Sequence, residues 1–170
     1  MERKIPFPHI GKMAIVLSLL AVIYSGFDLT KVFASGGWTQ IDANSEQNGG
    51  MACAFDTLRN RGVRFGGDDS SLNQHNRTYE WTGNAWQLVA SSGPPPRVNS
   101  AMAFDSSRGQ AIIFGGWVKP DNYRGDTWFW NGASWNQATV TGPHARGNHT
   151  MAYDSARGKV VLFGDRKSVV

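Results

Sequence analysis

The sequence predicts an all-β fold of tandem antiparallel units, because a fixed period and a recurring set of turn residues run through it. Four sets of identical residues recur at intervals of 49 positions. The sets are Asp56, Asp105 and Asp154; Phe65, Phe114 and Phe163; Trp81 and Trp130; Trp86 and Trp135. A period near 50 residues with a Gly-Gly doublet and a later tryptophan is typical of repeat architectures. We therefore expect each period to fold as one supersecondary unit.

Four short β-strands are expected in each unit. In the unit that starts at Arg97, β-forming residues lie in four runs separated by Gly and Asn, without helical periodicity. The expected strands span residues 101–104, 111–114, 127–130 and 134–138. The single cysteine, Cys53, excludes an intrachain disulfide. It occupies the position of Met102, so we expect a buried core residue rather than a reactive thiol.

The turn between the first two strands has the same chemistry in every copy. An aspartate opens it and can accept local backbone N–H groups, and the three are Asp56, Asp105 and Asp154. Gly109 and Gly158 follow at the end of this turn, where positive φ is expected. The first copy has Asn60 there, the non-glycine residue that tolerates this conformation best.

Glycine doublets and tryptophans mark the later part of each unit. The doublets end the second strand and allow positive φ or close backbone approach, and they are Gly66-Gly67 and Gly115-Gly116. The recurring tryptophans are expected to pack between adjacent sheets, and they are Trp81, Trp86, Trp130 and Trp135. Trp117 has no tryptophan counterpart one period earlier and is therefore a candidate for an exposed contact.

The combined motif resembles kelch repeats. It is carried by Arg146-x-x-His149, by the run 151–154 (MAYD) and by the run 160–164 (VVLFG), with Trp135 closing the preceding unit. The resemblance covers Trp38 to about Asp165. More specifically, the repeats resemble those of bacterial secreted kelch proteins of the galactose-oxidase-like superfamily. It implies an incomplete β-propeller of four-stranded antiparallel blades. It implies no single function, because such propellers serve as interaction platforms, sugar-oxidase scaffolds and isomerases.

The repeats divide the chain into five segments. We expect a leader (1–34), the end of a preceding blade (35–47), two kelch blades (48–96 and 97–145) and a partial third blade (146–170). After Gly164 the third copy departs from the pattern. These segments amount to about two and three-quarter blades, whereas closed propellers have ~4–8 blades. Three explanations remain, namely a truncated product, a piece of a longer reading frame, or a subunit that completes the ring by oligomerising.

The first 34 residues have the order of a secretory signal peptide. Basic residues precede the apolar run 13–24, and Val32-Phe33-Ala34 offers small residues for a cut after Ala34. We expect this segment to form a hydrophobic helix. Its removal would leave the rest secreted, periplasmic or on a bacterial cell surface. An uncleaved anchor is the alternative, and membrane contact is expected only in that case.

Charge and motifs argue against several functional classes. The formal net charge is +4 without a run of Lys or Arg, so nucleic acid is not expected as a partner. His144 and His149 lack a recognised metal spacing, and no phosphate loop or nucleophile elbow occurs. Copper sugar oxidases with similar blades need a cysteine beside a tyrosine, whereas Cys53 aligns with core methionines. We expect no metal, no cofactor and no enzymatic activity.

The longer loops are expected to share one side of the molecule. In an up-and-down blade, the loops after the second and fourth strands emerge on the same side, and loops on a rigid scaffold usually carry binding. Binding candidates there are Trp117, Asp121, Tyr123, Arg124, Asp69 and His75, with Asp68, Asn73, Asn122, Arg97 and Arg146 nearby. For Arg97 and Arg146 we expect a structural role, bonding neighbouring backbone carbonyls.

These residues favour a non-catalytic binding module of a secreted protein. Aromatic, Asp, Asn and Arg side chains suit a carbohydrate or an acidic peptide, so an unidentified glycan or protein is the expected partner. Scaffold blades of a carbohydrate-active, galactose-oxidase-like enzyme are one alternative. A non-functional truncated product is the other.

Overall fold

The computed structural model describes residues 31–34, 37–40 and 49–164, and all regular structure within them is β-strand. The predicted leader helix falls on residues 1–30, which lie outside the described residues. The last four residues of the predicted leader, Lys31–Ala34, form strand β1 and not part of a helix. Within the described residues, no helix has the length and hydrophobicity that a membrane span requires.

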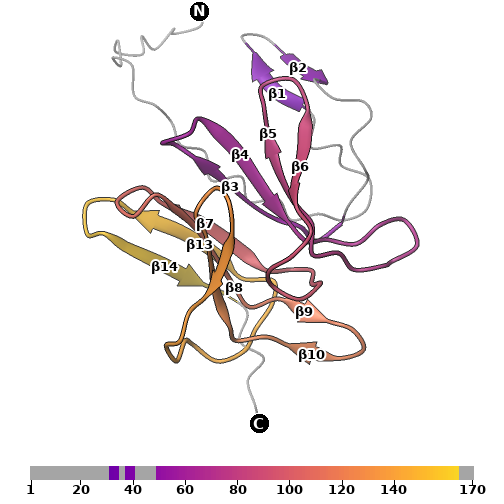
Figure 1. Ribbon diagram of the computed structural model, residues 1–170, viewed down its shortest axis with the longest axis vertical. Helices are drawn as coiled ribbons and strands as arrows, with labels where there is room; N and C mark the ends of the chain where they lie inside the picture. The colour runs from indigo at the N-terminus through magenta and orange to yellow at the C-terminus, as the bar shows by residue number, and fades with distance from the viewer. Residues whose placement is uncertain (1–30, 35–36, 41–48, 165–170) are drawn as a thin grey trace, which may run out of the picture.

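Two four-stranded antiparallel sheets form the centre of the molecule (Figure 1). The first sheet follows chain order and contains β3 (Ala52–Asp56), β4 (Arg61–Phe65), β5 (Thr78–Trp81) and β6 (Trp86–Ala90). The second contains β7 (Ala101–Asp105), β8 (Gln110–Phe114), β11 (Thr127–Trp130) and β12 (Trp135–Gln137). The four strands expected in one unit are thus present, with ends that differ by at most one residue.

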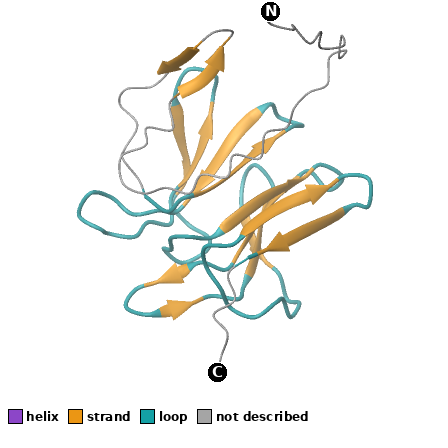
Figure 2. Ribbon diagram, turned by 180° about the vertical axis from the view of Figure 1, so that it is seen from behind, coloured by secondary structure: helices purple, strands orange, loops and turns teal. Residues whose placement is uncertain are grey.

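Three two-stranded sheets complete the structure. The third repeat forms β13 (Thr150–Asp154) and β14 (Lys159–Phe163), and the N-terminal hairpin forms β1 and β2 (Gly37–Gln40). A short hairpin, β9 (Trp117–Val118) and β10 (Asn122–Tyr123), lies in the loop after β8 and was not expected. Seen from behind, β13 and β14 lie beside the second sheet, and β1–β2 lie beside the first (Figure 2).

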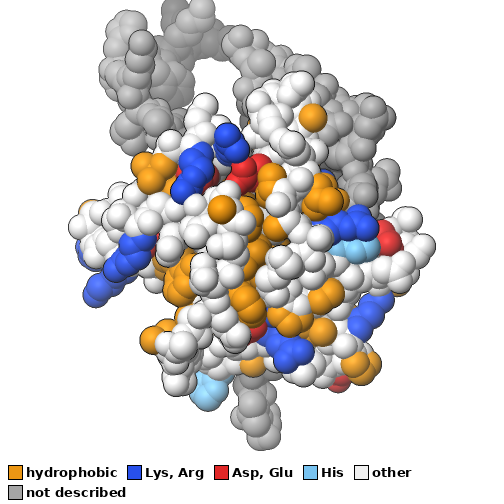
Figure 3. Space-filling model, in the orientation of Figure 1, with side chains coloured by type: hydrophobic (Ala, Val, Ile, Leu, Met, Phe, Trp, Pro, Cys, Tyr) orange, Lys and Arg blue, Asp and Glu red, His pale blue; other side chains and the backbone are white. Residues whose placement is uncertain are grey.

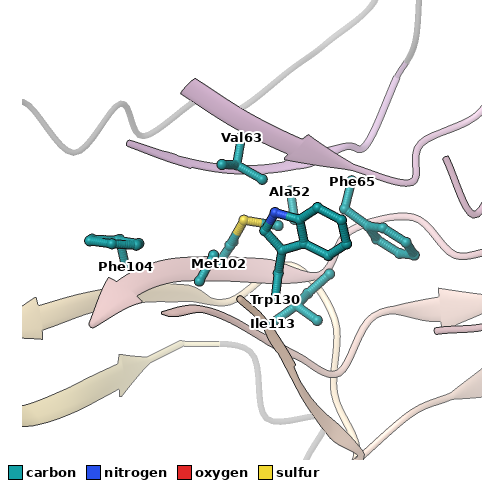
Figure 4. Close-up of a cluster of buried hydrophobic side chains, with 8 residues drawn as sticks. Ala52, Val63, Phe65, Met102, Phe104, Ile113 and Trp130 are labelled. Atoms are coloured by element: carbon teal, nitrogen blue, oxygen red, sulfur yellow. The ribbon is translucent and has the colours of Figure 1, made fainter. Parts of the chain in front are cut away.

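The larger hydrophobic core lies between the two four-stranded sheets. Side chains alternate along each strand, so Met102 and Ile113 face the first sheet, while Phe114 faces the third repeat. Figure 4 shows the Trp130 ring between Val63 and Phe65 from the first sheet and Met102 and Ile113 from the second. A second cluster around Phe114 and Met151 joins the second sheet to β13–β14.

Two tryptophans of the second sheet form hydrogen bonds with the first sheet. The indole Nε1 of Trp130, 1% exposed, donates to Glu80 Oε1 at 3.2 Å, and that of Trp135 donates to Thr78 Oγ1 at 2.8 Å. The Trp135 ring also meets Phe65 edge-on, with ring centroids 5.1 Å apart. Packing between sheets, as predicted, is therefore the role of Trp130 and Trp135.

Trp81 and Trp86 lie on the opposite face of the first sheet, which no other described four-stranded sheet covers. Their rings pack against each other with centroids 5.6 Å apart, and the Arg64 guanidinium lies 4.7 Å from the Trp86 ring. Cys53 shares this outward face, because its neighbours in β3 face the core. Cys53 therefore does not belong to the core between the two four-stranded sheets. It is half-buried, and burial raises the pKa of its thiol.

The aspartate turns have the predicted geometry in all three copies. Oδ1 of each aspartate accepts backbone N–H groups of the turn. Each Oδ2 also pairs at 2.6 Å with an arginine three residues later, which was not expected, and these pairs are Asp56–Arg59, Asp105–Arg108 and Asp154–Arg157. Positive φ occurs where it was predicted, at Asn60 (54°), Gly109 (67°) and Gly158 (63°).

Backbone hydrogen bonds also connect each repeat to the next. Asn99 N–H donates to Gly50 O at 2.7 Å, and Asn148 N–H donates to Asn99 O at 3.0 Å. These three residues lie one period apart and share positive φ, 63°, 58° and 54° in chain order. Arg59 adds a side-chain link, since it donates to the carbonyls of Gly109 and Asn131 in two turns of the second repeat at 3.3 and 2.7 Å.

Candidate functional site: the loop face

The long loops lie together on one side of the sheets, as predicted. We call this side the loop face, and it comprises residues 66–78, 91–99, 115–126 and 141–148. Val98 and Trp117 form an antiparallel bridge between two of these loops. Gly67 N–H donates to Arg97 O at 3.0 Å, and Gly116 N–H donates to Arg146 O at 2.8 Å, so each doublet is bonded to the next repeat.

The glycine doublets make this contact between repeats sterically accessible. All four glycines have positive φ, between 66° and 100°. A Cβ on Gly66 would lie 2.5 Å from Arg97 O, and one on Gly115 would lie 2.5 Å from Arg146 O. Both predicted reasons for the doublet, positive φ and close backbone approach, are therefore confirmed.

Arg97 has the structural role that was predicted for it. Its side chain is 0% exposed and donates through Nη1 to Gly115 O at 2.9 Å and through Nε to Pro95 O at 3.1 Å. It also forms a bidentate ion pair with Asp126 at 2.7 and 2.8 Å. Arg146 repeats the two carbonyl contacts, to His144 O and Gly164 O. Arg97 is thus committed to the scaffold.

Asp126 completes the Arg97 site and was not predicted. Burial raises the pKa of its carboxyl, but hydrogen bonds from Arg97 and from Trp128 Nε1 outweigh this effect and lower the pKa. The first repeat gave no indication of the pair, because Asn48 and Arg77 occupy the equivalent positions there.

The first loop is organised around Asp69. Its Oδ1 accepts N–H groups of Ser71 and Asn73, both at 2.9 Å, and its Oδ2 lies 3.1 Å from Asn73 Nδ2 and 3.3 Å from His75 Nε2. The backbone hydrogen bond from Asn73 is the main cause of the lowered pKa of Asp69. Asp69 and His75 are therefore brought together. Asp68 forms bridges with Gly49 and Gln74.

The second loop places aromatic side chains on the short β9–β10 hairpin. Trp117 and Tyr123 are paired across it and both are half-buried. Trp117 Nε1 lies 3.4 Å from Asp121 Oδ1. The Tyr123 ring lies against Gly147, where a Cβ would come within 3.1 Å of its edge. Arg124 N–H donates to Gly116 O at 2.8 Å, which fixes the end of the hairpin.

Gln74 connects the two loops and was missed by the sequence interpretation. Its Nε2 donates to Trp117 O at 3.2 Å, and its Oε1 accepts the Lys119 N–H at 2.9 Å. Lys119 Nζ in turn contacts Leu72 O. The Asp69–His75 and Trp117–Asp121 pairs thus belong to one connected surface, while Tyr123 and Arg124 lie toward the third repeat. Gln74 does not recur at the 49-residue period, so the repeat pattern gave no indication of its role.

Other features of the surface lie apart from these residues. A shallow hollow of about 200 Å³ is lined by Arg59, Asn60, Arg61, Trp81 and Thr82 on the turn side. No group of three or more His, Cys, Asp or Glu side chains that could hold a metal ion converges within the described part of the chain. On the face shown in Figure 3, Lys and Arg lie in separate small groups instead of one continuous patch.

Comparison with known proteins bears on the fold alone. No protein-family model matches the sequence, and a search of curated proteins finds no match. The solved structure of YjhT, a kelch-type β-propeller-like protein, matches with a TM-score of 0.56 and 20% sequence identity. The fold is that of a kelch-like β-propeller. The match covers 69% of this chain but only 34% of YjhT, so the chain spans about a third of that protein's length.

Proposed function

We infer that the chain is a non-catalytic binding module of a secreted kelch-like protein and that its loop face binds a glycan. The main support is the connection of the two loops through Gln74, which holds the half-exposed ring of Trp117 beside the polar Asp69–His75 loop. Aromatic rings cover the apolar faces of sugar rings, while carboxylate and amide groups bond the hydroxyls. A protein partner is the alternative ligand.

The contacts of the acidic residues agree with a binding role. The carboxylates of Asp56, Asp105 and Asp154 bond turn N–H groups and arginines, and Asp126 pairs with buried Arg97. These carboxylates are therefore engaged in the scaffold and not positioned as an acid–base pair. We assign them no catalytic role.

Binding of the full chain to glycan and protein arrays tests this function. Trp117→Ala and Tyr123→Ala should each weaken binding at least about fivefold, because each removes stacking area at a rigid site (about 1–3 kcal/mol on truncation). Leu58→Ala is the matched control, since this side chain is 63% exposed but lies in a turn between β3 and β4. Unchanged affinity in both loop variants would exclude the loop face as the binding site.

A further inference from the structure

Leu72 in the first loop has a backbone conformation that is otherwise taken by Gly and Asn among the described residues. Its φ is +60°, in the left-handed region. The other non-glycine residues with positive φ in this part of the chain are asparagines, namely Asn60, Asn99 and Asn148. Glycine lacks a Cβ and asparagine can form local hydrogen bonds, whereas a bulky leucine side chain makes this conformation unfavourable. The local backbone therefore disfavours leucine at position 72.

Burial of the side chain does not offset this strain, because Leu72 is 60% exposed. Leu58 on the turn side is similarly exposed at 63%, but its φ is not positive. An exposed leucine is ordinary in a folded protein, but one that is also strained is unusual. Strained residues cluster where proteins hold ligands. Folding alone therefore gives no reason for leucine at this position.

Hydrogen bonds on both sides hold Leu72 in this conformation. Its own N–H donates to Asp69 O at 2.8 Å. The N–H groups of its neighbours Ser71 and Asn73 both donate to Asp69 Oδ1 at 2.9 Å. From the second loop, Lys119 Nζ contacts Leu72 O. The loop therefore holds an apolar side chain at a fixed place on its surface.

We propose that Leu72 contacts the bound ligand and selects glycans that carry a methyl group, as 6-deoxy and O-methylated sugars do. This inference rests on the proposed glycan binding of the loop face. Gln74 and Lys119 connect the Leu72 loop to the Trp117 loop, so both apolar side chains belong to one connected surface. A flat indole ring can cover the C–H face of a sugar ring. An aliphatic side chain forms no hydrogen bonds, so it favours a methyl group over a hydroxyl at the same position.

Glycan-array binding of the full chain tests this selection, with sugars paired so that they differ at one substituent. One pair is a 6-deoxyhexose and its parent hexose, and another is an O-methylated sugar and its unmethylated form, which separates the two sources of the methyl group. The wild type should bind the methyl-bearing member of at least one pair about fourfold more tightly, the factor expected for burying one small apolar group. Leu72→Asn should abolish this preference.

The same variant should be more stable than the wild type. Asparagine adopts positive φ more readily than leucine, so Leu72→Asn should raise Tm by about 2–4 °C in a thermal melt. Leu72→Met keeps an apolar side chain and the strain, so it should keep both the preference and the wild-type Tm. Leu58→Asn is the matched control, because it makes the same change at a similarly exposed leucine without positive φ. It should neither raise Tm nor alter binding.

Three results would overturn the proposal. They are a wild type that shows no preference for methyl-bearing sugars, a Leu72→Asn variant that keeps the preference, and a Leu72→Asn variant with a lowered Tm, since the leucine would then stabilise the fold. Trp117→Ala separates this inference from the proposed function. If Trp117→Ala weakens binding but Leu72→Asn leaves the preference unchanged, only the role of Leu72 is excluded. If the wild type binds no glycan, both proposals fail.

Discussion

The second four-stranded sheet and the third repeat have similar sequences but very different burial. In the second sheet, Ile113 and Phe114 face opposite sides and are 0% and 3% exposed. In the third repeat, Leu162 still packs against the second sheet, but Phe163 is 79% exposed. The comparison shows that a strand of this fold buries only the faces that neighbouring repeats cover, as expected for a stacked repeat architecture.

Truncating the two equivalent phenylalanines should give the largest difference between these regions. Phe114→Ala removes a ring between two packed sheets and should lower the free energy of unfolding by about 3–5 kcal/mol. Phe163→Ala should change it by less than about 1 kcal/mol, because this side chain is 79% exposed. Urea denaturation followed by tryptophan fluorescence measures both. Equal losses of stability in Phe114→Ala and Phe163→Ala samples would mean that the two faces are equally covered, contrary to the structure.

A smaller, pH-dependent difference is expected between Asp105 and Asp154. Burial of the Asp105 carboxyl raises its pKa, but hydrogen bonds from Ser107, Arg108 and Tyr153 prevail and lower the pKa to about 2. Because the folded-state pKa lies below the usual aspartate value of 3.8, this contribution is complete above pH ~4 and is lost as the pH falls through about 2. Asp105→Asn should therefore cost about 1–2 kcal/mol at pH 7 and clearly less at pH 2.

Asp154→Asn is the matched control for this experiment. Asp154 has the same turn and the same arginine pair, but its side chain is 23% exposed, compared with 2% for Asp105. The control should therefore lose less stability at pH 7. Unfolding free energies of both variants between pH 2 and 7 provide the comparison, and a loss for Asp105→Asn that is independent of pH would exclude the proposed ionisation.

The features that were predicted from sequence are those that recur at the period. Strand positions, aspartate turns and glycine doublets follow from local backbone requirements, which each copy must meet independently. The set Gly50, Asn99 and Asn148 was missed although it also keeps the interval of 49, because two residue types share one φ requirement. Cys53 keeps the repeat position of Met102, but it is less buried, because the first four-stranded sheet covers Met102 and no described four-stranded sheet covers the Cys53 side.

The loop face was predictable only in outline. Up-and-down topology brings the long loops together, and this was expected. Their contacts depend on residues outside the repeat, of which Gln74 and Asp126 are the examples. A single copy of a loop offers no second copy for comparison, so its side-chain partners emerge only from the folded structure.

The central claim is that tandem sheets pack side by side with tryptophans between them, and indole N–H exchange measured by NMR tests it most directly. The Nε1–H groups of Trp130 and Trp135 should exchange slowly, because they donate to Glu80 and Thr78, which are 2% and 0% exposed. The half-buried Trp117 indole should exchange much faster. Exchange of the Trp130 and Trp135 indoles as fast as that of Trp117 would contradict the packing of these sheets.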